Sequence, residues 1–70
     1  GTEKTNVEGV IGREARVTEQ IDNRMETGEA VLAGQYWSAR AAGADEVIGK
    51  GERVIVEAVE GVKLIVRKIR

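Results

Sequence analysis

The sequence predicts a small all-β domain, and three observations carry this prediction. Short runs rich in Val, Ile and Ala recur along the 70 residues, with glycines between them. Several of these runs alternate apolar and polar residues, which is the period of a half-buried strand. Proline is absent, and the close spacing of the runs is typical of a small sandwich or barrel.

The strands can be placed one after another from this alternation. The first is expected over about residues 13–21, where small apolar residues alternate with charged ones. A polar segment, 22–27, then reads as a loop. The second and third strands are expected over about 28–33 and 35–41.

Ala33-Gly34 is predicted to be a two-residue hairpin loop, because glycine adopts the positive φ that such loops require. This loop would pair Leu32 with Gln35 and place Ala30 opposite Trp37. Trp37 would then share one face of its strand with small residues, among which a large ring can pack. Those residues are Ala39 and Ala41.

Residues 42–51 connect the third strand to the last hairpin and are too few for a substantial helix with its turns. Val47 and Ile48 are the bulky apolar residues of this connection. We expect one of them to plug an end of the barrel.

The last hairpin is formed by two apolar-rich runs that meet at Glu60-Gly61, and two registers compete for it. A two-residue Glu60-Gly61 loop would mix charged and apolar side chains on both faces. A three-residue loop that starts at Val59, with Gly61 in a bulge, separates them. We expect the second register, because a one-residue slip would turn one strand's apolar set outward. Its inner face would hold Val54, Val56, Ala58, Val62, Leu64 and Val66.

The outer face of that register supplies a candidate partner-contact patch. Glu57 would pair with Lys63 as opposite charges, and Ile55 would pair with Ile65. Two isoleucines on an outer face have two explanations. The 42–51 connection or a neighbouring strand partly covers them, or they form an exposed patch for a partner protein.

The residue types argue against an enzyme, a cofactor and a metal site. The chain has no His and no Cys, so the commonest general base, metal ligand and thiol nucleophile are missing. The single serine, Ser38, lies in an expected strand. Gly49-Lys50-Gly51 lacks the longer pattern of a phosphate-binding loop.

Charge and aromatic content argue against nucleic-acid binding. Eleven basic and twelve acidic residues give a net charge of −1 and occur without blocks. Five short antiparallel strands in 70 residues fit an OB-like or an SH3-like barrel, and OB-folds often bind single strands through stacked aromatics. Tyr36 and Trp37 are adjacent, so on a strand they point to opposite faces. Because an OB-like barrel is expected, binding of single-stranded nucleic acid or of an oligosaccharide is kept as the alternative function.

One domain is expected over residues 10–70, after a polar, flexible lead-in at 1–9. No apolar run approaches the ~20 residues of a membrane span, so we expect the fragment to be soluble.

Four segments in order resemble the C-terminal soluble domain of the NfeD family, and the resemblance extends from about Val10 to Lys68. Val10 to Ala15 open the barrel, and a glycine-bounded strand leads into Trp-Ser-Ala-Arg-Ala at 37–41. Ile-Gly-Lys-Gly at 48–51 and Val54 to Val66 follow.

The resemblance implies a five-stranded OB-fold at the end of a membrane protein, whose transmembrane helices precede this domain in segments that this chain does not contain. It also implies a non-catalytic interaction module that binds stomatin- or flotillin-like proteins, in membrane organisation or membrane-protein quality control. Self-association near the membrane is a second role that it implies.

Overall fold

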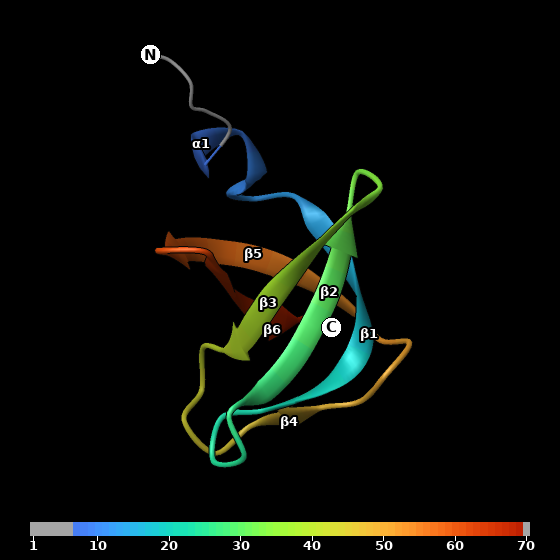
Figure 1. Cartoon of the computed structure of the whole chain (residues 1–70), viewed down its shortest axis with the longest axis vertical. Helices are drawn as coiled ribbons and strands as arrows, with labels where there is room; N and C mark the ends of the chain where they lie inside the picture. Colours follow the sequence, from blue (N-terminus) through green and yellow to red (C-terminus); the bar gives the residue numbers. More distant parts are fainter. Residues whose placement is uncertain (1–6, 70) are drawn as a thin grey trace.

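A closed five-stranded barrel forms the body of the computed structural model, which describes residues 7–69 (Figure 1). The prediction of a small five-stranded OB-like barrel is confirmed. The short helix α1 lies at one end of the barrel, and the two-residue strand β4 lies at the other. The elements are α1 (Val7–Val10), β1 (Glu14–Asp22), β2 (Thr27–Leu32), β3 (Gln35–Ala41), β4 (Val47–Ile48), β5 (Arg53–Glu60) and β6 (Lys63–Lys68).

The barrel closes in the order β1, β2, β3, β6, β5 and back to β1. Every neighbouring pair is antiparallel except β3 and β6, which run parallel. Such a parallel pair cannot be joined by a tight hairpin, and here the chain passes through β4 and β5 between the two strands.

Strand β1 bends so that it pairs with three strands. One edge pairs with β2 from Arg16 to Asp22, while the other edge pairs with β5 at Glu14–Arg16 and with β4 at Ile21 and Asp22. The β1–β2 register shifts twice, between Val17 and Glu19 and between Glu19 and Asp22. Irregularities of this kind bend a strand and increase its twist, which is what closure of a small barrel requires.

The Asn23 side chain ties the β1–β2 turn to the end of β3. Its amide nitrogen donates to the backbone oxygen of Ala41 at 2.8 Å, and its amide oxygen accepts from the Ala41 backbone nitrogen at 2.9 Å. This pair of bonds imitates one step of a strand ladder. It satisfies the backbone of a strand end that would otherwise need water.

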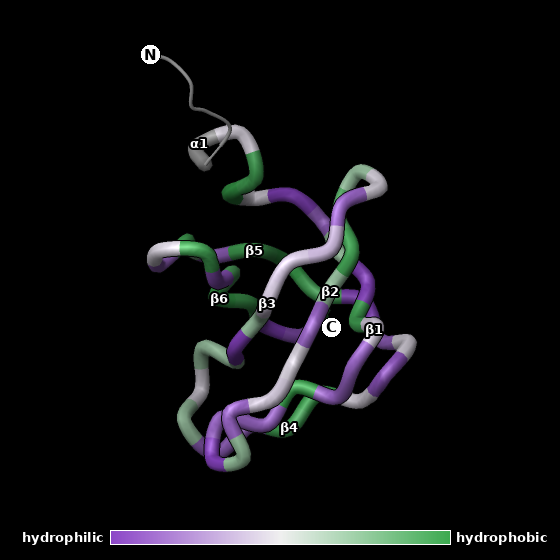
Figure 2. Tube along the Cα trace, in the orientation of Figure 1, coloured by the Kyte–Doolittle hydropathy of each residue, from purple (hydrophilic) through white to green (hydrophobic). Residues whose placement is uncertain are grey.

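The core consists of aliphatic side chains contributed by every strand and by α1. Among the described residues none of its members is aromatic, polar or charged. Figure 2 shows the hydrophobic residues gathered along β5, β6 and β4. The buried set is Val10, Ala15, Val17, Ile21, Ala30, Leu32, Ala39, Ala41, Ile48, Val54, Val56, Leu64 and Val66.

The β2–β3 hairpin has the predicted register. Leu32 lies opposite Gln35 and Ala30 opposite Trp37, so Ala33-Gly34 is a two-residue loop. Both loop residues have positive φ, 53° and 80°, which is the pattern of a type I′ turn. Trp37 packs against the core on the same face as Ala39 and Ala41, as expected.

The connection between β3 and β5 confirms that one of its two bulky residues plugs the barrel. Ile48 is fully buried and lies opposite Ile21 of β1, while Val47 is 41% exposed. The burial of Ile48 explains why a two-residue strand forms here.

The predicted register of the β5–β6 hairpin is wrong, and so is the alternative to it. Glu60 lies opposite Lys63, which leaves Gly61-Val62 as the loop. Gly61 has φ 62° and Val62 has no positive φ, as a type II′ turn requires. Val62 is consequently 75% exposed instead of facing the core.

The Gly61-Val62 turn sets the register at the tip of the hairpin, and a bulge at Glu57 then shifts it by one residue. Val56 lies opposite Val66, but the next paired residue is Ala58, opposite Ile65. The extra residue changes which side chains of β5 face inward, so Val59 packs against the core. Both predicted registers assumed continuous pairing, which would have turned Ala58 or Glu57 inward instead.

Residues 1–6 of the expected lead-in lie outside the described residues, and Val7 to Gly9 belong to α1. No helix within residues 7–69 combines the length and the apolar character needed to cross a membrane.

Replacement of Ile48 by Ala should lower the free energy of unfolding by about 2 to 4 kcal/mol, because it leaves a cavity in a fully buried site. Replacement of the neighbouring, exposed Val47 by Ala should cost less than about 0.5 kcal/mol. Urea unfolding of both variants measures the difference. Equal losses would mean that Ile48 does not plug the barrel.

The hairpin register predicts different costs for the same substitution at two valines. Val59→Ala should cost about 1.5 kcal/mol, because Val59 packs against the core. Val62→Ala should cost less than about 0.5 kcal/mol, because Val62 lies in the exposed loop. Urea unfolding again provides the measurement, and a larger loss at Val62 would restore the register in which Val62 faces inward.

Candidate partner-binding surfaces

The four residues of the sequence-predicted patch, Ile55, Glu57, Lys63 and Ile65, all belong to β5 and β6, but they are not paired as expected. Ile55 lies opposite Arg67 of β6 and Glu14 of β1. Ile65 lies opposite Ala58 of β5 and Arg40 of β3. The expected Ile55–Ile65 pair is therefore wrong, because the Gly61-Val62 turn displaces β6 along β5 and the Glu57 bulge takes back only one residue of this displacement.

The expected Glu57–Lys63 pair is also wrong. The Glu57 carboxylate meets the Arg67 guanidinium, with Oε2 2.6 Å from Nε, and Lys63 lies opposite Glu60. Both isoleucines are half-buried. Closure of the barrel places β1 beside Ile55 and β3 beside Ile65, so neighbouring strands give partial cover. The β5–β6 patch, as we call these four residues, is a mixed surface and not an apolar one.

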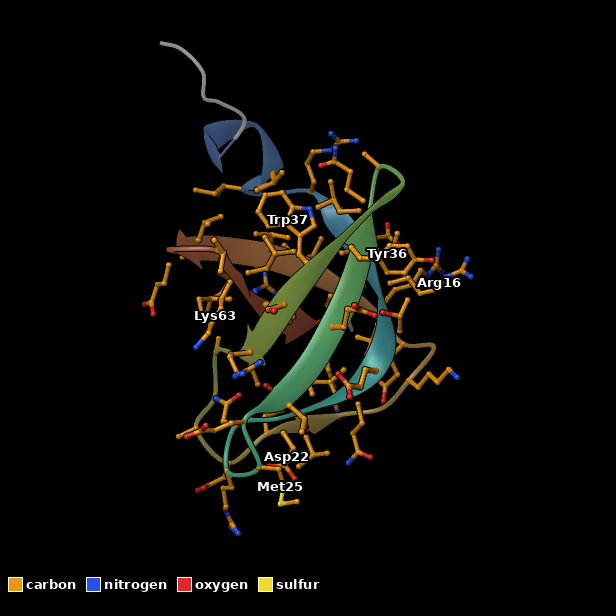
Figure 3. All side chains as sticks on the ribbon, viewed as in Figure 1. Arg16, Asp22, Met25, Tyr36, Trp37 and Lys63 are labelled. Carbon is orange, nitrogen blue, oxygen red and sulfur yellow. The ribbon has the colours of Figure 1, made fainter. Side chains whose placement is uncertain are left out.

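A second surface lies on strands β1, β2 and β3, and sequence reasoning did not find it. Arg16 of β1 lies opposite Val31 of β2, and Val31 lies opposite Tyr36 of β3. On its other side Arg16 lies opposite Arg53 of β5. Figure 3 shows the Arg16 and Tyr36 side chains next to each other. We call Arg16, Val31, Tyr36 and Arg53 the Arg16 face.

The alternation of the sequence predicts that the residues of the Arg16 face point outward. It does not predict that they lie close to one another. Arg16 and Tyr36 each occupy a polar-face position of an expected strand. Which strands are neighbours, and in which register β1 meets β2, depends on the bend of β1.

A pocket of about 250 Å³ lies at the α1 end of the barrel, where the Trp37 ring lies below the helix (Figure 3). The Trp37 indole nitrogen is buried and has no hydrogen-bond partner among the described residues. Because this nitrogen is shielded from the surface, it is not a ready contact for a ligand. The pocket is lined by Gly9, Val10, Arg13, Leu32, Ala33, Gln35 and Trp37.

Groupings of acidic side chains that could hold a metal ion do not occur within the described part of the chain. Ser38 is exposed on β3 and lies opposite Glu29 and Lys63, with no base arranged to activate it. Within residues 7–69 the geometry therefore offers surfaces for contact and assembles no catalytic group.

The family is decided by the comparison with family models. A model described as the NfeD-like C-terminal, partner-binding domain matches residues 7–68. The chain belongs to the NfeD family. Its predicted resemblance is thereby confirmed over nearly the whole sequence.

Two solved structures are similar to this NfeD domain. One is the soluble domain of a membrane protein implicated in regulation of membrane protease activity from Corynebacterium glutamicum. It is 30% identical, with a TM-score of 0.82 over 90% of this chain and 97% of that chain. The other is the C-terminal domain of a stomatin operon partner protein from Pyrococcus horikoshii. It is 33% identical, with a TM-score of 0.80 over 96% and 98% of the two chains. A search of curated proteins found no match.

Trp37→Phe should change the free energy of unfolding by less than about 1 kcal/mol, because the lost indole N–H has no partner. Trp37→Ala should cost about 3 kcal/mol, because the ring packs against the core. Thermal or urea unfolding followed by circular dichroism suits both variants, since neither keeps the tryptophan. If Phe were as costly as Ala, the indole N–H would be making a bond that stabilises the fold.

Proposed function

We propose that this chain is the interaction module of an NfeD-like membrane protein and that it binds a stomatin- or flotillin-type partner near the membrane. The role would be in membrane organisation or membrane-protein quality control. The observation that carries the proposal is the match of residues 7–68 to a domain described as partner-binding. The similarity to a domain from a stomatin operon partner protein supports the choice of partner.

The chemistry of the chain supports contact in place of catalysis. Without His or Cys it lacks the side chains that most often act as general base or nucleophile near neutral pH. Among the described residues the barrel is filled by aliphatic side chains, which leave no polar site for a substrate in its interior. The outward faces of the strands are then the surfaces at which a partner can bind.

The β5–β6 patch is one proposed contact surface. Ile55 and Ile65 expose part of their side chains there, and Glu57 and Lys63 are exposed beside them. Tyr, Trp and Arg dominate the energetics of most protein interfaces, and the patch itself contains none of them. Its contribution would come from complementary shape and charge.

The proposed function predicts saturable binding between this chain and a purified stomatin-type protein of the same organism. Biolayer interferometry with the immobilised chain measures it, and the unfolded chain in urea serves as the blank. In a longer protein that carries the domain, deletion of residues 10–68 should abolish co-purification with the stomatin-type protein. Unchanged co-purification after the deletion would contradict the binding role.

A parallel titration with single-stranded DNA at low salt tests the alternative of an OB-type nucleic-acid binder. Binding through phosphate contacts would weaken steeply as salt rises. Tight, salt-sensitive binding of DNA without binding of the stomatin-type protein would replace the proposed function.

A further inference from the structure

The Arg16 face combines a positive charge and an exposed aromatic ring around a shallow hollow. The hollow has a volume of about 310 Å³ and is lined by Glu14, Ala15, Arg16, Val31 and Arg53. Tyr36 is 67% exposed and lies beyond Val31 in the same cross-strand row. Arg and Tyr are among the residue types that supply most binding energy at protein interfaces.

The charges of this face are not balanced within the described residues. Arg16 and Arg53 lie directly opposite each other on β1 and β5, and like charges in that position destabilise a sheet. Arg53 is partly neutralised by Glu14, with Nη1 3.2 Å from Oε2. No ion pair between described residues involves the exposed guanidinium of Arg16. The arrangement has a positive charge that an incoming anion would neutralise.

We propose that the Arg16 face binds an acidic segment of the partner protein. A carboxylate of that segment binds the Arg16 guanidinium, whose planar fork matches a carboxylate with two hydrogen bonds. An adjacent apolar side chain of the segment packs on Val31 and the Tyr36 ring. This inference rests on the proposed function, because it names the surface and the chemistry by which the domain would hold its partner.

The composition of the face favours an acidic protein segment over nucleic acid. Binding of single strands uses several aromatic platforms along a basic groove. Here Tyr36 is the exposed aromatic residue, and Glu14, whose carboxylate pairs with Arg53, lines the hollow. The face thus offers one guanidinium beside one ring, which suits a single carboxylate next to an apolar side chain better than a phosphate backbone.

The test is a nuclear magnetic resonance titration of the ¹⁵N-labelled chain with a synthetic peptide of alternating Glu and Leu. A peptide of alternating Lys and Leu and a single-stranded DNA of equal length are titrated in parallel. We expect the acidic peptide to shift the amide signals of Arg16, Val31 and Tyr36. Equal binding of the Lys-Leu peptide, or tighter binding of the DNA at these residues, would overturn the proposal.

Charge reversal at two exposed arginines gives a matched pair of variants. Arg16→Glu should weaken binding of the acidic peptide at least about tenfold, and Tyr36→Ser should weaken it by a smaller factor. Arg24→Glu makes the same charge change in the turn between β1 and β2, outside both named surfaces, and should leave the affinity within about twofold. Retained amide spectra establish that each variant is folded. If Arg16→Glu bound as well as the original chain, the proposal would fail.

Arg16→Glu and a Lys63→Glu variant of the β5–β6 patch, tested against the stomatin-type protein, separate this inference from the proposed function. Loss of binding in Arg16→Glu but not in Lys63→Glu supports both. Binding that survives Arg16→Glu and is lost in Lys63→Glu keeps the proposed function, moves the contact to the β5–β6 patch and overturns this inference. If the original chain does not bind the stomatin-type protein, the proposed function fails, and the peptide titration decides the inference alone.

Discussion

The bend in β1 is the constraint on which the rest of the structure depends. Closure of a small barrel requires strongly tilted and staggered strands, and irregularities in pairing supply the bend. The two register shifts in β1 achieve this, so that its start pairs with β5 and its end with β4. Ile21 and Ile48 then meet at one end of the barrel and exclude water from the core.

The same bend arranges the surface. Because β1 lies between β5 and β2, Arg16 has Arg53 on one side and Val31 on the other. Arg16 alone would be an ordinary outward residue of a strand. Through these pairings it belongs to a cross-strand row, Arg16, Val31 and Tyr36. Closure also places β1 beside Ile55 and β3 beside Ile65, which reduces the apolar surface they expose.

The two hairpins show how far sequence reasoning reaches. In the β2–β3 hairpin the pairing is continuous, so the turn residues and the alternation agree and the register follows from them. In the β5–β6 hairpin nearly every residue is apolar or long and charged, and several registers bury a similar set. The observed register combines the Gly61-Val62 turn with the Glu57 bulge, which lets Val59 pack against the core. The Ile55–Ile65 and Glu57–Lys63 pairs of the candidate patch were predicted from the wrong register and are wrong for the same reason.

The amino-acid sequence by itself determined the class of fold, the extent of most strands, the Ala33-Gly34 turn, the burial of Ile48 and the family. These features depend on alternation, turn chemistry and motif order, which are local along the chain. Tertiary structure alone decided the bends in β1, the bulge in β5 and the meeting of Arg16 with Tyr36. Their free energies depend on burial against strands that are distant in sequence, and no local pattern contains that information.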